Sequence, residues 1–373
     1  MKLPVTVHAP ESAGAASQAD AKPAATAAFA APQQAIDIST TASAVAIAEL
    51  RRLLAAWRIH EPGARLGSDP EELHQLRVTA RRIDAILGLF KRQLPASLVR
   101  ARKATKTVLR HLGGTRDLDV QLAELADYCT RLSEEERAAA EPLRAHLESE
   151  RIRARTRMIR ALDSEPTRRW LQTLETVGAD DGADGSDRVM LVMPQRVRRR
   201  FRKLRKSVSK LRERSPMEDY HLVRRRAKQL RYATECGAVI FGRPADDLLK
   251  ALRRLQDGLG AHQDAYMAQK RLAALAADPA SGLPPATLFL MGRLAEHHAR
   301  TTAQTRRTLQ RSWRRVRGKR WKALRARLAE LRDRADAAGA DLPAPDAVPA
   351  ESSPPDVTSS GHPVASEPRP LRH

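Results

Sequence analysis

Two stretches of this chain carry a histidine followed by Arg or Lys at intervals of three and four residues, with one further Arg directly after the first series. The first comprises His74, Arg77, Arg81 and Arg82, and the second comprises His221, Arg224, Lys228 and Arg231. Residues at this spacing share one face of a helix. Arg binds phosphate through paired donors and Lys binds it as a point charge. These two rows, here called the ladders, therefore indicate a surface for a phosphate-rich ligand.

Further basic residues follow each ladder in the next expected helix. They are Lys103, Lys106 and Arg110 after the first ladder, and Lys250 and Arg253 after the second. Rows on consecutive helices place several cations around one space. We therefore expect more than one helix to line a common basic channel.

The two stretches match at a constant offset, which indicates an internal duplication. His74 and His221 lie 147 positions apart, and so do Asp117 and Asp264 at the end of a second motif. No gap is needed between these pairs. We therefore predict two similar helical bundles.

An apolar stripe runs along the first ladder helix at three-and-four spacing, as on the core-facing edge of an amphipathic helix. It consists of Leu73, Leu76, Ala80, Ile83, Leu87 and Phe90, with Tyr220, Val223, Ala227, Leu230, Thr234 and Gly237 at the matching positions. His74, Arg77 and Arg81 each come one position after a stripe residue, about 100° of helix rotation away. They are expected to flank the buried face at the mouth of a groove.

Basic residues beside an apolar stripe are often only solvated, with their stems covering apolar neighbours. Pairing with acids distinguishes this reading from ligand binding. The stretch 195–214 carries a single acid, Glu213, and like charges in one helix repel unless anions come from outside. A ligand role for the ladders is therefore favoured.

His74 and His221 near helix starts also fit a hydrogen-bonding role, but their repetition at one register favours ligand contact. A metal role is disfavoured, because the neighbouring ladder residues are Arg and Lys, which are not usual metal ligands. His297 and His298 are adjacent and are expected at the surface.

Asp117 and Asp264 each follow a Gly-containing segment that reads as a turn. We expect them to orient an arginine or to cap a helix, in support of the basic site. Two lone acids in separate repeats are a weak acid–base pair, and no nucleotide-binding, metalloprotease or nucleophile-elbow motif is found. The sequence therefore predicts neither an enzyme nor a cofactor.

Charge and composition narrow the class of partner. The net charge is +23 and the pI is about 11.0, and such a field attracts polyanions. Cys129 and Cys236 are far apart within helical patterns, which favours ordinary thiols in a reducing compartment. No apolar run reaches the length of a membrane span and no export signal is recognised, so we expect a cytoplasmic protein.

Helical periodicity dominates the middle of the chain, which predicts an all-α fold. Residues 1–39 and 338–373 are rich in Ala, Pro and Ser and are expected to be disordered tails. The folded region, 40–337, is expected to divide into halves 40–176 and 188–337 around a linker at 177–187.

The motifs resemble the CHAD family, the conserved histidine α-helical domain, over about residues 41–335. The segments that carry the resemblance are HQLRVTARR (74–82), LGGTRDLDV (112–120), HLVRRRAKQLRY (221–232) and LQDGLGAHQDA (255–265). The resemblance implies two pseudo-symmetric bundles around a basic channel that binds inorganic polyphosphate, and association with polyphosphate granules. It implies phosphate contacts for the eight ladder residues, with Lys103, Lys106, Lys250 and Arg253 as additions.

Two acids depart from the repeat. Asp84 stands at the position that matches Arg231, and Asp257 at the position that matches Arg110. The first half would then make fewer contacts at that turn, or Asp84 would pair internally. The acidic and basic strand motif of the triphosphate-tunnel domain, to which many family members are fused, is missing, so no hydrolase activity is expected.

Two alternatives remain open. The charge, and a basic helix expected over 297–327, would also suit a nucleic-acid-binding protein. However, aromatic residues are only 3% of the chain, and Trp57, Trp170, Trp313 and Trp321 lie in helical patterns that favour core packing over base stacking. A granule-associated scaffold that recruits other proteins is the second alternative.

Overall fold

The computed structural model describes residues 40–176, 187–212 and 214–340, and this part of the chain is helical without strands. The first group of helices is α2 (Ala42–Leu66), α3 (Pro70–Leu89), α4 (Ala96–Cys129), α5 (Glu134–Leu162) and α6 (Glu165–Glu175). The second group is α7 (Val189–Lys210), α8 (Met217–Cys236), α9 (Ala238–Phe241), α10 (Arg243–Ala276), the 3₁₀ helix η1 (Pro279–Ser281), α11 (Pro285–Arg317) and α12 (Lys319–Ala340). The predicted all-α class is confirmed.

Local sequence signals account for where several helices begin. Asp69 caps α3 through its side chain and Pro70 occupies the first turn, where a missing N–H costs nothing. Ser133 and Glu136 form a reciprocal capping box at the start of α5. These signals set the first residues of α3, which carries the first ladder, and of α5.

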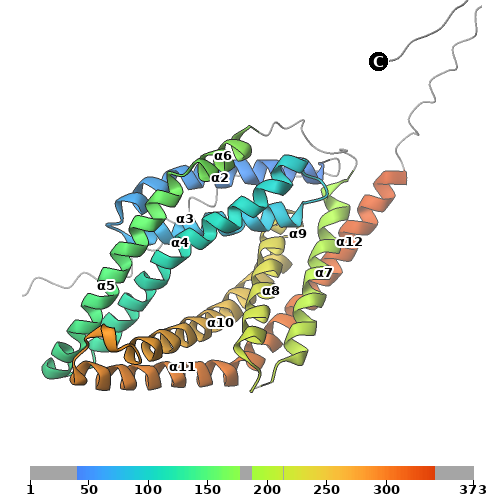
Figure 1. The fold of residues 1–373 in the computed structure, drawn as a ribbon. Coiled ribbons are helices and arrows are strands. Elements are labelled where there is room, and N and C mark those ends of the chain that lie inside the picture. Colours follow the sequence, from blue (N-terminus) through green and yellow to red (C-terminus); the bar gives the residue numbers. More distant parts are fainter. Residues whose placement is uncertain (1–39, 177–186, 213, 341–373) are drawn as a thin grey trace, which may run out of the picture.

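Two pairs of helices form the largest contacts between the two groups. In Figure 1, α2–α6 run along the top and left, and α7–α12 run along the right and bottom. Helix α3 contacts α8 where the ladders lie, and α5 contacts α11 at the other end of the molecule. Within the groups, α3 packs on α2 and α4, and α8 packs on α7 and α10. The ladder helices are therefore held against each other by both groups.

The predicted apolar stripes are buried in both ladder helices. Leu76 and Ala80 of α3 and Val223 and Ala227 of α8 have no exposed surface. Burial of such side chains is the main source of stability in a helical fold. Because the stripes face the core, the positions one residue later flank it, which sets where the ladders point.

Aromatic side chains fill the core of each group. Trp57 and Trp170 meet edge to face at 5.1 Å between ring centroids, and the Trp170 indole N–H donates to Thr105 Oγ1 at 2.8 Å. In the second group Phe201 stacks on Trp321 at 3.7 Å and lies 5.7 Å from Trp313. Packing, rather than base stacking, is therefore the observed role of these tryptophans.

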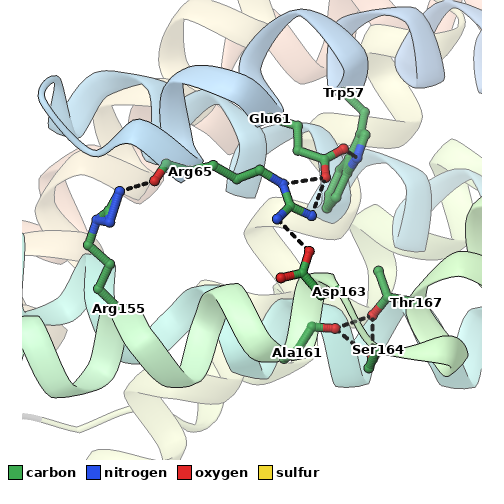
Figure 2. A network of polar contacts seen from close by, with 8 residues as sticks. All are labelled: Trp57, Glu61, Arg65, Arg155, Ala161, Asp163, Ser164 and Thr167. Carbon is green, nitrogen blue, oxygen red and sulfur yellow. Dashed lines mark hydrogen bonds and ion pairs between the residues drawn. The ribbon is translucent and has the colours of Figure 1, made fainter.

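A polar network fastens α2 to α5 and its C-terminal end (Figure 2). Glu61 accepts from Trp57 at 2.7 Å and from Arg65 Nε at 2.9 Å, and Arg65 also donates to Asp163 at 2.6 Å. Arg155 donates to the main-chain carbonyl of Arg65. These arginines have carboxylate or carbonyl partners, so they belong to the scaffold and not to the candidate site.

Three sequence interpretations were wrong. The Gly-containing segments 112–117 and 259–264 are not turns but lie within α4 and α10. His298 is not at the surface: it is 6% exposed, because the buried face of α11 includes it. The expected basic helix over 297–327 is broken at Gly318, where α11 ends.

The matching helices also share their bounds. Helices α3 and α8 begin and end 147 positions apart, and so do α4 and α10. The duplication and the symmetry of the halves stay predictions. The expected tails lie outside the described residues over 1–39 and 341–373, and so does the expected linker over 177–186, whereas α12 extends to Ala340.

Candidate functional site

The ladders line cavities between α3 and α8. One, the histidine cavity, has a volume of about 370 Å³ and is lined by residues of α3, α4, α8 and α10. It brings together His74, Arg77, Arg81, Asp117, His221, Arg224 and Asp264. Both ladders therefore face a shared interior space.

A second cavity of about 370 Å³, the lysine cavity, continues from the first. Arg81, His221 and Arg224 line both cavities, and Lys106 and Lys228 line the second. A third cavity of about 700 Å³, the α7 cavity, shares Arg102 and Arg200 with the second. The three cavities thus adjoin one another between the histidines and α7, and together they are here called the channel.

Asp117 holds the first ladder in place. Arg77 Nη1 donates to Asp117 Oδ1 at 2.8 Å and to the Gly113 carbonyl at 3.4 Å. A Cβ on Gly113 would lie 3.7 Å from Arg77 Nη2, so the glycine leaves room for the guanidinium against α4. Asp117 thus orients an arginine, one of its two expected roles, and does not cap a helix.

The second ladder is less compensated. Its histidine is oriented, since His221 Nδ1 donates to Gln263 Oε1 at 3.2 Å. The buried Arg224 Nε has no hydrogen-bond acceptor among the described residues. In the same part of the chain no ion pair neutralises Arg81, Arg224 or Lys228. Buried donors without acceptors are rare in native proteins, so the Arg224 guanidinium is a candidate anion-binding group.

Burial and mutual repulsion shift the ionisation of these groups. Burial, with help from Arg81 and Arg224, lowers the pKa of Lys228 to about 6. Burial and Arg77 lower the pKa of Arg81 to about 10. Burial and Arg116 likewise lower the pKa of His74. The channel thus holds cations whose charge costs free energy until an anion enters.

Carboxylates gather at one end of the channel. Glu124 and Asp264 both line the histidine cavity. Burial, with the nearby Asp264, raises the pKa of Glu124 to about 7, and burial raises the pKa of Asp264 although Arg224 opposes this. Within the described residues no three His, Cys, Asp or Glu side chains lie close enough to hold a metal ion. The histidine cavity therefore mixes carboxylates with its cations, whereas Asp84 is the one acid that lines the lysine cavity among the described residues.

Six predicted contact residues do not line the channel. Arg82 and Arg231 both lie 3.7 Å from Glu235. The others are exposed and outside the three cavities: Lys103, Arg110, Lys250 and Arg253. On α4, Lys103 and Arg110 come two positions after a buried residue, about 200° of rotation from the core, so they face away from α8.

Sequence reasoning missed several cations of the channel. Arg102 comes one position after the buried Ala101, so the spacing rule that placed the ladders would have found it. It pairs with Asp84 at 2.9 Å, which is the internal pairing considered for that acid. Arg116 lines the histidine cavity, and Arg196, Arg199 and Arg200 come from the acid-poor stretch that begins at residue 195. That stretch was a signal, but nothing in it indicated which arginines face inward.

The family model described as "CHAD domain" matches residues 48–273, more than half of the chain. A comparison with curated proteins finds no match.

Two solved structures are similar in fold. The crystal structure of the CHAD domain from the plant Ricinus communis has a TM-score of 0.62 and 24% identity, and the match covers 76% of this chain and 94% of that one. PptA from Streptomyces chartreusis has a TM-score of 0.59 and 21% identity, with 74% and 99% covered. At these identities the two structures support the fold alone. The family model, which spans the ladders and four of their neighbouring helices, identifies the chain as a member of the CHAD domain family.

Proposed function

We propose that the channel binds inorganic polyphosphate without turning it over. The observation that carries the proposal is the cluster of Arg81, Arg224 and Lys228, which is half-buried and forms no ion pair with a carboxylate among the described residues. A chain of phosphates supplies one negative charge after another, which suits a continuous row of cations. The CHAD family is also linked to polyphosphate.

The lining of the channel favours phosphate over nucleobases. Trp57, Trp170 and Trp313 are each less than 5% exposed, and single-stranded nucleic acids are usually held by accessible aromatic rings. The only aromatic residue lining the lysine cavity, Tyr232, is buried, with Arg231 over its ring at 5.0 Å. A polymer that offers phosphate oxygens but no bases therefore fits best.

The composition of the lysine cavity supports non-catalytic binding. Among the described residues the lysine cavity, in the middle of the channel, is lined by cations and a single acid, Asp84, which is paired with Arg102. We therefore expect the bound chain to be retained and not cleaved. Association with polyphosphate granules in the cytoplasm is part of this proposal, since a retained polymer would carry the protein with it.

The test is a competition experiment at physiological salt. Labelled polyphosphate bound to the protein is challenged with unlabelled polyphosphate, duplex DNA and RNA at equal phosphate concentration. We expect polyphosphate to compete best and the recovered chain length to be unchanged. Better competition by DNA or RNA would refute the ligand, and shortened chains would refute non-catalytic binding.

Two double variants test whether the channel is the binding site. Arg81→Ala with Arg224→Ala is compared with Lys250→Ala with Arg253→Ala, which removes the same charge from exposed positions of α10 outside the channel. We expect only the first pair to weaken binding strongly, with unchanged helical content in both. Equal effects would mean that bulk charge, not the channel, holds the polymer.

A further inference from the structure

The net charge of the chain is concentrated away from the ladders. Residues 188–212 contain eleven Lys and Arg and no acid, and residues 297–329 contain twelve Lys and Arg and no acid. Together these two stretches account for the whole net charge of +23, so the remaining residues balance. Helices α7, α11 and α12, which contain these stretches, therefore carry the excess of positive charge.

Helix α7 presents basic residues on both sides of its buried stripe. Met193, Val197, Phe201, Leu204 and Val208 form the stripe at three-and-four spacing. On one side lie Arg196, Arg199, Arg200 and Lys203, which line the α7 cavity of the channel. On the other side, about 120° of helix rotation away, lie Arg202, Arg205 and Lys206, which line a separate cavity. Helix α7 thus lines both the α7 cavity and this separate cavity.

This separate cavity, the exterior groove, has a volume of about 660 Å³ and lies between the ends of α7 and α11. Its charged residues are Arg202, Arg205, Lys206, Arg212 and Arg317, and no acid among the described residues lines it. All five are exposed. No ion pair within the described residues involves Arg202, Arg205 or Arg317. Its cations are therefore open to an anion from solution.

The groove has a rigid base and a fixed rim. Trp313 and Leu211 line it and are each 4% exposed, and Trp313 packs beside Phe201. Arg212 donates to the main-chain carbonyl of Ser209 at 2.8 Å, which holds that arginine at the end of α7. The tryptophan ring is covered, so it offers no face for a nucleobase.

We propose that the exterior groove is a second binding site for a phosphate chain, separate from the channel. Arginine-rich walls without acids suit phosphate oxygens, which accept paired hydrogen bonds from guanidinium groups. With the channel on the other side of α7, one protein then holds two chains, or two segments of one chain. The protein cross-links polyphosphate, because two sites on a rigid body cannot both be filled by a single short chain. The cross-linking rests on the proposed function, whereas binding in the groove does not.

The experiment uses three full-length variants and calorimetric titration with short-chain polyphosphate at physiological salt. The groove variant is Arg202→Ser with Arg205→Ser and Arg317→Ser. Its control, Arg137→Ser with Arg157→Ser and Arg160→Ser, removes the same charge from exposed positions of α5. The channel variant is Arg81→Ala with Arg224→Ala.

We expect two classes of site in the natural protein and in the control variant. The groove variant should lose one class, with affinity there reduced at least about tenfold, and the channel variant should lose the other. Long-chain polyphosphate should produce turbidity with the natural protein and the control but not with the groove variant.

Three outcomes would overturn the proposal: a single class of site in the natural protein, an equal loss in the control variant, or stronger displacement from the groove by duplex DNA than by polyphosphate. If the channel variant kept both classes while the groove variant lost one, the proposed function would fail and the exterior site would stand.

Discussion

The two ladders resemble each other in sequence but differ in how their charges are balanced. Arg77 of the first ladder forms an ion pair with Asp117 at 2.8 Å, whereas Arg224 at the matching position of the second forms none among the described residues. The Nε atoms of both arginines are buried without an acceptor in that part of the chain. Beyond them, Asp84 pairs with Arg102 in the first half, while Lys228 stands among arginines in the second. The matching arginines therefore differ in pairing: a carboxylate holds Arg77, whereas Arg224 and Lys228 form no ion pair among the described residues.

This difference indicates which cations should contribute most of the binding free energy. A cation that already has a carboxylate partner gains little from a new anion, because it exchanges one ion pair for another. A buried cation without a partner gains the full interaction, because its desolvation has already been incurred in folding. We therefore expect the second ladder to dominate affinity.

The largest expected effect comes from removing one ladder at a time. Arg224→Ala with Lys228→Ala should weaken polyphosphate binding by about 100-fold or more, since two uncompensated charged contacts are lost. His74→Ala with Arg77→Ala should weaken it by roughly tenfold. Fluorescence titration of both variants, with circular dichroism as a check of folding, measures the contrast. Equal losses would mean that the two ladders contribute alike.

The next effect separates binding from stability. The folded protein holds the pKa of Lys228 near 6, below its ordinary value of 10.5. Between these values the unfolded chain binds a proton that the folded chain does not, so this residue makes stability rise with pH. Lys228→Met should therefore raise the melting temperature at pH 7 by on the order of 2 °C and flatten its dependence on pH, while weakening binding.

Lys106→Met is the matched control for this variant, because Lys106 lines the same cavity but is exposed. Its melting temperature should stay close to that of the natural protein. A loss of stability in Lys228→Met would show that the lysine is held by partners and not by burial among like charges.

The smallest effect concerns the acid that interrupts the first half. Asp84→Asn removes a negative charge from the lysine cavity and releases Arg102. Affinity for polyphosphate should rise by a factor of about two to five, the scale of a partly exposed ion pair. Asp257→Asn, at an exposed position of α10 outside the channel, should change it less. A fall in affinity would mean that Asp84 is needed to orient Arg102.

Periodicity was enough to predict the helices and the buried faces of α3 and α8. Leu76, Ala80, Val223 and Ala227 follow three-and-four spacing, and the structure buries all four. The same periodicity placed Arg77 and Arg224 beside the core. It failed for the glycines of α4 and α10, because a helix tolerates glycine where a neighbouring guanidinium packs against it, as Arg77 does against Gly113.

Contacts between helices that are far apart in the chain could not be predicted from the sequence. Arg200 reaches the lysine cavity because α7 packs on α8, and no local pattern distinguishes Arg200 from Arg202, which faces the exterior groove. The position of Glu235 between Arg82 and Arg231 also depends on how α3 meets α8. Charge balance at the site is therefore a tertiary property, which the list of basic residues alone did not reveal.

The most direct test of this account is the uptake of protons when polyphosphate enters the channel. A phosphate chain beside Lys228 should raise the pKa of that amine, so at pH 7.5 the natural protein should take up about one more proton per chain than the Lys228→Met variant. Calorimetry in two buffers of different ionisation enthalpy measures this difference. Affinity should then increase as the pH falls toward 6 in the natural protein but less so in the variant. Identical proton uptake by the two proteins would contradict the claim that the second ladder is neutralised by the bound chain.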